Sequence, residues 1–275
     1  MSELHHLPPE RPTAAAGRAT DPGEAIIERL RAAGCVFAED EARLLIAHAE
    51  RFDELDALVS RRVAGEPLEQ ILGWAEFGGQ RIGIDPGVFV PRRRSELLAR
   101  LAIARARDGA VVVDLCCGSG AVGAVVMAAL DRIELHATDI DPAAARNARR
   151  NLPDAATVYV GDLDEPLPRR LRGHVDVLVA NTPYVPTAEI ELMPPEARVH
   201  EPREALDGGA DGLDVTRRVI AAAPRWLAPG GSVLVETSDR QAPALTDVVV
   251  ARGLTSRIVH SDDLDATVVI GTKRL

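Results

Sequence analysis

The sequence predicts an α/β fold, in which helices cover a mainly parallel sheet and a small helical bundle precedes it. Three observations lead to this prediction. Short apolar runs alternate with helical segments from residue 95 onward, as expected of parallel strands joined by crossover helices. One of these runs, 110–115, leads directly into a glycine-rich turn that opens a helix. The last two runs, 255–260 and 266–271, are joined by a short acidic loop, which predicts an antiparallel hairpin at the end of the sheet.

The part of the chain before residue 95 differs in pattern and divides into three. Residues 1–22 are rich in Pro, Ala and charge, which predicts a disordered leader. Residues 23–78 place apolar side chains at helical spacing, which predicts about three helices and a short one near Pro67, packed as a bundle. This bundle has no catalytic constellation, so we expect it to recognise a substrate or to act as a scaffold. Residues 79–94 are predicted to be a β-hairpin linker, because residues 80–90 alternate around an Asp-Pro-Gly turn.

The glycine-rich turn has the features of a cofactor-binding loop. Gly118, Gly120 and Gly123 match the pattern G-x-G-x-x-G, and glycines let a ligand approach the backbone closely. Nicotinamide-dependent dehydrogenases have the same pattern, so it is a weak signal alone. Asp114 favours another cofactor, since its carboxylate would repel a pyrophosphate but suits the cationic methionine part of S-adenosylmethionine. The loop from Asp114 through Cys116 to Gly120 is therefore a candidate site for S-adenosylmethionine.

Two more acidic residues follow strands and are further cofactor candidates. Asp139 lies nineteen residues after Gly120, in the range of a carboxylate that accepts both ribose hydroxyls. Capping of the next helix is the structural alternative, but Asp141 is better placed for it, directly before Pro142. Asp162 follows a third short strand and is expected to face the adenine amino group, although aspartate in a Gly-Asp turn is often structural.

Asn181, Thr182, Pro183 and Tyr184 form the most informative motif, because they follow the buried apolar strand 175–180 directly. The Asn side-chain oxygen and the backbone carbonyl of Thr182 can both accept hydrogen bonds from an NH₂ group, while the Tyr ring covers its flat face and Pro stiffens the turn. An amide nitrogen needs orientation and charge stabilisation more than a strong base. The motif therefore predicts methylation at nitrogen, with Asn181 also next to the cofactor; the structural alternative is an ordinary turn with a surface tyrosine.

Composition limits the classes of function. The formal net charge is −10, which argues against broad nucleic-acid binding, although a local basic patch stays open. Three cysteines, two of them adjacent, make no disulfide framework and fit a reducing cytoplasm. The histidines are scattered and no Cys-x-x-Cys occurs, so we expect no metal site. Neither a signal peptide nor a membrane span is predicted.

Taken in order, these motifs resemble the HemK/PrmC family, the release factor glutamine N5-methyltransferases, over roughly the last four-fifths of the chain. The similar stretches are 66–73, 76–77, 90–92, 95–96, 114–120, 181–184, 201–209, 211–214, and 229–231 with Glu236. The resemblance implies a class I methyltransferase fold, Rossmann-like with a seven-stranded sheet, over residues 95–275. It also implies methyl transfer from S-adenosylmethionine to a glutamine side-chain amide of a peptide chain release factor, which the helical bundle would dock. Asn181 and Tyr184 would then hold the amide.

Several positions depart from the family pattern. Asn-Pro-Pro-Tyr is Asn-Thr-Pro-Tyr here, with the change at Thr182, the residue expected to contribute only its carbonyl. The family usually has Pro-Arg-Pro, an acidic residue and Thr-Glu where this chain has Pro-Arg-Arg-Arg-Ser-Glu over 91–96, which adds positive charge. The sequence therefore resembles that of a divergent member of the family.

Three alternatives remain open at this point. A nucleic-acid adenine N6-methyltransferase would hold an exocyclic amine with the same four residues, 181–184, here called the clamp. The arginines at 92–94 would suit phosphates, but the net charge disfavours this alternative. A dehydrogenase is disfavoured by Asp114 and by the terminal hairpin. An inactive relative that still binds the cofactor would account for Thr182 and the altered arginine segment.

Overall fold

The computed structural model describes residues 22–275, and the chain divides into two compact units, Met1–Val63 and Ala64–Leu275. The predicted leader, 1–22, lies outside the described residues except for its last residue, with which the first helix begins. Because the two units are separate bodies, each is described by itself.

The smaller unit consists of the three predicted helices, α1 (Pro22–Ala32), α2 (Ala38–His48) and α3 (Phe52–Val63). Each helix contributes one side chain that is fully removed from solvent; these are Leu30, Leu45 and Val59. A buried ion pair between Glu41 and Arg62 joins α2 to α3, with Nε and Oε2 2.6 Å apart. The short helix expected near Pro67, α4 (Leu68–Leu72), belongs to the larger unit.

The hairpin at the start of the larger unit lies earlier than predicted. Strands β1 (Trp74–Phe77) and β2 (Gln80–Gly83) pair antiparallel around Gly78 and Gly79, which both have positive φ. A two-residue turn of this kind needs positive φ at both positions, which two glycines supply without strain. The hairpin predicted around the Asp-Pro-Gly turn of 80–90 was therefore wrong. There, the backbone N–H of Asp85 donates to the Asn147 side chain instead of to a strand, over 3.0 Å.

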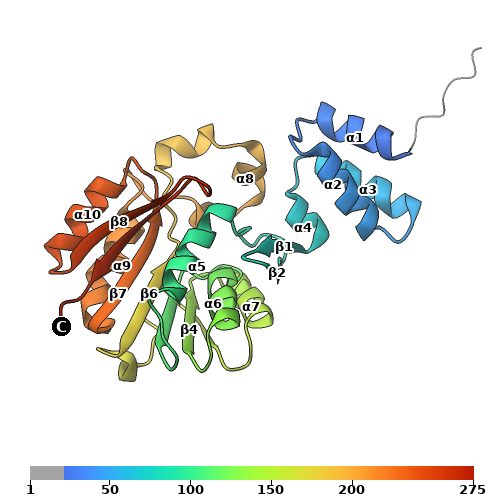
Figure 1. The fold of residues 1–275 in the computed structure, drawn as a ribbon. Coiled ribbons are helices and arrows are strands. Elements are labelled where there is room, and N and C mark those ends of the chain that lie inside the picture. The colour runs from blue at the N-terminus through green and yellow to red at the C-terminus, as the bar shows by residue number, and fades with distance from the viewer. Residues whose placement is uncertain (1–21) are drawn as a thin grey trace, which may run out of the picture. The chain divides into compact units, whose positions relative to one another are not determined.

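The central sheet has seven strands in the order β5-β4-β3-β6-β7-β9-β8 (Figure 1). Its strands are β3 (Val111–Leu115), β4 (Glu134–Asp139), β5 (Thr157–Val160), β6 (Val175–Ala180), β7 (Leu227–Thr237), β8 (Thr255–Ser261) and β9 (Ala266–Thr272). Strands β3 to β7 are parallel, while β9 is antiparallel to both β7 and β8. The predicted class I methyltransferase fold with its terminal antiparallel hairpin is confirmed.

Helices cover both faces of this sheet, because successive strand residues point to opposite sides. Val112 belongs to the core under α5, α6 and α7, and Val113 to the core under α9 and α10. Burying one such aliphatic side chain stabilises the fold by about 1.5–3 kcal/mol. These helices are α5 (Glu96–Ile103), α6 (Ala121–Ala129), α7 (Pro142–Asn151), α9 (Asp214–Trp226) and α10 (Ala242–Ala251). The connections add α8 (Pro195–His200) and the short 3₁₀ turns η1 (Arg93–Ser95), η2 (Arg169–Leu171), η3 (Thr187–Leu192) and η4 (Arg203–Ala205).

The strand register brings the predicted site residues to one edge of the sheet. Leu115 pairs with Thr138 of β4 and with Ala180 of β6, and Ala180 pairs with Val235 of β7. The residues that follow these positions therefore emerge side by side at the carboxyl edge. They are Cys116, Asp139, Asn181 and Glu236.

Candidate active site

A cavity of about 640 Å³ opens at this carboxyl edge, and it brings the predicted cofactor and clamp residues together. All predicted site residues line it except Gly120, which begins α6 behind it. The long connection 185–211, which follows the Asn-Thr-Pro-Tyr turn, also contributes to the lining through Val185 and Leu206. A concave site with several convergent polar groups is the usual setting for a small-molecule cofactor.

Asp114 and the two glycines shape the loop between β3 and α6. The buried Asp114 carboxylate accepts a hydrogen bond from the Gly123 N–H over 3.2 Å, at the first turn of α6. Burial raises the pKa of Asp114 to about 7, although this hydrogen bond opposes the shift. Gly120 has a φ of +78°, and a Cβ there would lie 3.1 Å from the Ala148 side chain, so it is needed for packing of the loop on α7. Gly118 has a φ of +55° and open space beside it, which suits a ligand.

Two backbone N–H groups hold the Asp139 carboxylate beside the glycine-rich loop. Its Oδ2 accepts from the Gly118 N–H over 2.8 Å, and its Oδ1 accepts from the Asp141 N–H over 2.9 Å. Each carboxylate oxygen keeps lone-pair capacity for a further donor such as a ribose hydroxyl. Asp141 caps α7 by accepting from Ala143, as the sequence predicted. The Thr138 hydroxyl beside it is buried without a hydrogen-bond partner among the described residues, as expected of a group that meets a ligand.

Cys116 and Asp162 lie at the same end of the cavity. Burial raises the pKa of the Cys116 thiol well above its usual range, so the side chain is neutral and is no nucleophile. Asp162 accepts a hydrogen bond from Arg218 of α9 over 2.7 Å, which fixes one of its oxygens. The adenine contact expected of Asp162 stays a prediction.

The clamp begins with Asn181, whose amide orientation is set by a residue far away in the sequence. Its Nδ2 donates to the Ser95 hydroxyl over 3.1 Å, which leaves Oδ1 as the free acceptor. Ser95 directly precedes α5, but its side chain makes no capping hydrogen bond; its hydroxyl accepts from Asn181 instead. Thr182 is buried, and its hydroxyl is 2.6 Å from the hydroxyl of Thr216.

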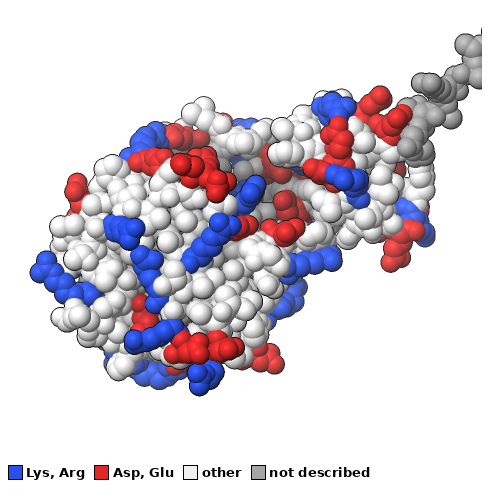
Figure 2. Space-filling view, viewed as in Figure 1, with Lys and Arg blue, Asp and Glu red and all other residues white. Residues whose placement is uncertain are grey.

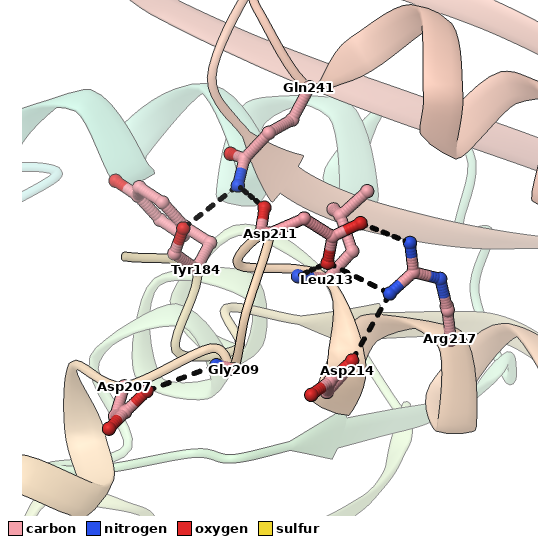
Figure 3. Close-up of polar contacts among 8 residues, drawn as sticks. All are labelled: Tyr184, Asp207, Gly209, Asp211, Leu213, Asp214, Arg217 and Gln241. Carbon is pink, nitrogen blue, oxygen red and sulfur yellow. Dashed lines mark hydrogen bonds and ion pairs between the residues drawn. The ribbon is translucent and has the colours of Figure 1, made fainter. Parts of the chain in front are cut away.

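Tyr184 is held by polar contacts at both ends. Its hydroxyl donates to Glu236 Oε1 over 3.3 Å, and the Arg94 guanidinium lies over the ring at 5.5 Å. Its backbone carbonyl accepts from Gln241 Nε2 over 2.9 Å, and the same nitrogen donates to the Asp211 carbonyl (Figure 3). Gly212 passes so closely that an added Cβ would lie 2.2 Å from the Tyr184 carbonyl oxygen. The ring is therefore placed by the segment around Gly212.

Figure 3 shows how that segment is itself held. Asp211 accepts from the Leu213 N–H over 3.1 Å and forms an ion pair with Arg217 of α9. Asp207 accepts from the Gly209 N–H over 3.0 Å, which turns the chain back toward the clamp. The Asp-Gly-Leu-Asp motif at 211–214 is thus fixed in the position where its Gly212 packs against the Tyr184 carbonyl.

Four residues of this site received no role from the sequence: Arg94, Ser95, Glu236 and Gln241. Glu236 was detectable, because it ends an apolar strand just as Asp114 and Asp139 do. The other three lie in segments far from the clamp in sequence, and no local pattern indicates their contacts with it.

Within residues 22–275 there is no group of three His, Cys, Asp or Glu side chains that could hold a metal ion. The helices of the same residues are too short or too polar to cross a membrane. On the face drawn in Figure 2, basic and acidic side chains are interspersed.

Comparisons with known proteins agree with this site. The model of the methyltransferase small domain family matches residues 81–210. A release factor glutamine methyltransferase of Geobacter sulfurreducens is 36% identical over 78% of this chain and 75% of its own length. One of Mycolicibacterium smegmatis is 36% identical over 85% and 93%. A solved methyltransferase from Pyrococcus furiosus, 18% identical, has the same fold, with a TM-score of 0.53 over 82% of this chain and all of its own.

These relatives bear out the predicted family, enzyme class and cofactor, S-adenosylmethionine. Their identity to this chain extends over most of both lengths, well beyond the glycine loop that methyltransferases share with other enzymes. The chain belongs to the family of release factor glutamine methyltransferases.

Proposed function

We propose that this protein transfers the methyl group of S-adenosylmethionine to the side-chain amide nitrogen of a glutamine in a peptide chain release factor. The observation that carries the proposal is the Asn181 amide, whose Nδ2 is occupied by Ser95 so that its oxygen is left for an NH₂ group. This acceptor stands at the strand edge next to the glycine loop, within one cavity.

Binding and orientation account for most of what the protein must do. Asp139 would hold the cofactor's ribose and Asp162 its adenine, while the loop from Asp114 to Gly120, with Cys116, would bind its methionine part. When bound, S-adenosylmethionine supplies an electrophilic methyl group on a sulfonium. The polar groups on Asp139 and Thr138 fit such a ligand, since both keep unused hydrogen-bonding capacity.

The clamp acts on the acceptor nitrogen. Asn181 Oδ1 and the Thr182 carbonyl accept the two amide hydrogens, and the Tyr184 ring covers the flat face of the amide. Both acceptors carry partial negative charge, so they stabilise the positive charge that develops on nitrogen more strongly in the transition state than in the ground state. Pro183 keeps the two acceptors in one fixed turn.

The helical unit is the proposed docking site for the release factor. Its helices lie in the predicted substrate-recognition domain, residues 23–78. The predicted linker is 79–94, and the predicted catalytic domain is 95–275. Its support is the names of the relatives, which are release factor glutamine methyltransferases. Because release factors work on ribosomes, the proposed compartment is the cytoplasm.

The test is methyl transfer from labelled S-adenosylmethionine to a purified release factor, with the modified residue identified by mass spectrometry. We expect one glutamine to be labelled, and we expect Asn181→Ala to lower kcat by about 10²–10³ while cofactor affinity and melting temperature stay near wild type. Labelling of RNA or DNA instead would favour the adenine methyltransferase. Full transfer by Asn181→Ala would mean that the turn is structural.

A further inference from the structure

Glu236 is a buried carboxylate in the active-site cavity for which the clamp gives no role. It ends β7, is 2% exposed, and lines the cavity beside Tyr184. Its Oε1 accepts from the Tyr184 hydroxyl and faces Arg94 Nε, both over 3.3 Å. Its Oε2 is buried and has no hydrogen-bond partner among residues 22–275. A buried carboxylate oxygen without a donor is costly, so it needs a functional explanation.

The proposed reaction leaves one proton to be placed. The acceptor amide nitrogen starts with two hydrogens; the new N–C bond forms as the C–S bond breaks, and the neutral product amide carries a single hydrogen. The second proton must therefore pass to another group. The Asn181 oxygen and the Thr182 carbonyl accept hydrogen bonds, but amide oxygens are too weakly basic to keep a proton near neutral pH.

The other carboxylates that line the cavity are engaged elsewhere. Asp114 and Asp139 receive backbone N–H donors of the cofactor loop. Asp141 caps α7, Asp162 is bound by Arg218, and Glu204 is exposed on the 185–211 segment. Among the described residues of the cavity, this leaves Glu236 as the carboxylate with a buried, unengaged oxygen next to the clamp.

We propose that Glu236 is a further catalytic residue, whose Oε2 accepts the proton that the glutamine amide loses during methyl transfer. Tyr184 and Arg94 fix Oε1, so the second oxygen has a defined direction. The inference rests on the proposed function, because it needs an amide held by Asn181 and Thr182.

The surroundings of Glu236 suit this role. Burial raises the pKa of Glu236, while hydrogen bonding from Ser95 and Tyr184 and the charge of Arg94 act against the shift. The groups that face the Glu236 carboxylate are Arg94 and Ser95 at the start of α5 and Tyr184 after β6, and Arg92 in turn acts on Tyr184. A carboxylate with a raised pKa is a better base than an exposed glutamate.

The experiment compares Glu236→Gln with the wild type in the release factor assay. Gln keeps an acceptor for the Tyr184 hydroxyl but cannot take up the proton, so we expect kcat to fall by about 10²–10⁴ with cofactor affinity unchanged. Wild-type kcat should fall with decreasing pH as Glu236 becomes protonated, and this acidic limb should disappear in Glu236→Gln. Glu201→Gln is the matched control, because Glu201 is also buried and paired with an arginine, Arg92, at 2.6 Å, so its acidic limb should remain.

A second variant guards against a purely structural effect. Glu236→Ala leaves space in an open cavity, and added formate should restore part of its kcat if a proton acceptor is what is missing. Full kcat and an intact acidic limb in Glu236→Gln would overturn the inference, as would a Glu236→Ala variant that formate fails to rescue. Absence of transfer by the wild type would instead refute the proposed function, and the inference with it.

Discussion

Ser95 offers a direct test of how the clamp is oriented. Asn181 Nδ2 donates to the Ser95 hydroxyl over 3.1 Å, and Ser95 is 2% exposed, so water does not readily replace it. In Ser95→Ala the side-chain amide of Asn181 loses this partner and can rotate so that its NH₂ and oxygen exchange places. An NH₂ group then lies where the substrate needs an acceptor. A neutral hydrogen bond contributes about 0.5–1.5 kcal/mol, so the correct orientation should lose a factor of about 2–12 in relative population.

The assay is kcat/KM for release factor methylation, and we expect a loss of the same size. Ser95→Thr keeps the hydroxyl, and threonine is the usual family residue, so this control should stay within about twofold of wild type. Cofactor affinity measured by calorimetry should not change in either variant. Full kcat/KM in Ser95→Ala, or an equal loss in Ser95→Thr, would refute the argument that the hydroxyl sets the amide orientation.

Two further predictions concern the cofactor site and the threonine of the clamp. Asp139→Ala should weaken S-adenosylmethionine binding by about 1–3 kcal/mol, because the ribose and the Gly118 N–H both lose their acceptor; an unchanged Kd in calorimetry would contradict it. Thr182→Pro should keep activity, since only the carbonyl acts, but should lower the free energy of unfolding by about 1–3 kcal/mol by leaving the Thr216 hydroxyl unpaired. Denaturant unfolding measures this, and adding Thr216→Val should recover most of the loss; no recovery would argue against the pairing.

The central strands of the sheet were predictable because they are buried on both faces. Strands of that kind appear as mainly apolar runs, and the runs ending at Leu115 and Ala180 became the strands β3 and β6 at the expected places. The hairpin before the sheet was not found, because two signals competed. The Asp-Pro-Gly turn is a strong local pattern, but the glycines at 78–79 supply positive φ at both turn positions, and Asp85 is bound by α7.

The site was predictable as far as strand ends could locate it. Asp114, Asp139 and Asn181 each follow a parallel strand, and parallel strands end at one edge, so their proximity follows from the fold. Ser95 and Gln241 could not be found in this way. Each belongs to a segment that reaches the clamp only through tertiary packing, and in the sequence Ser95 has the ordinary appearance of a helix cap.

The departures from the family pattern have local partners in the structure, which bears on whether they signal lost activity. The Thr182 hydroxyl lies 2.6 Å from that of Thr216, so the side chain that stands in place of Pro has a buried hydrogen-bond partner. Arg94, which replaces an acidic residue, lies over Tyr184 and pairs with Glu236, so it neutralises a buried carboxylate that an acidic neighbour would repel. The charge of Arg94 opposes the burial that raises the pKa of Glu236. Both departures therefore have local partners, and the clamp residues keep their contacts.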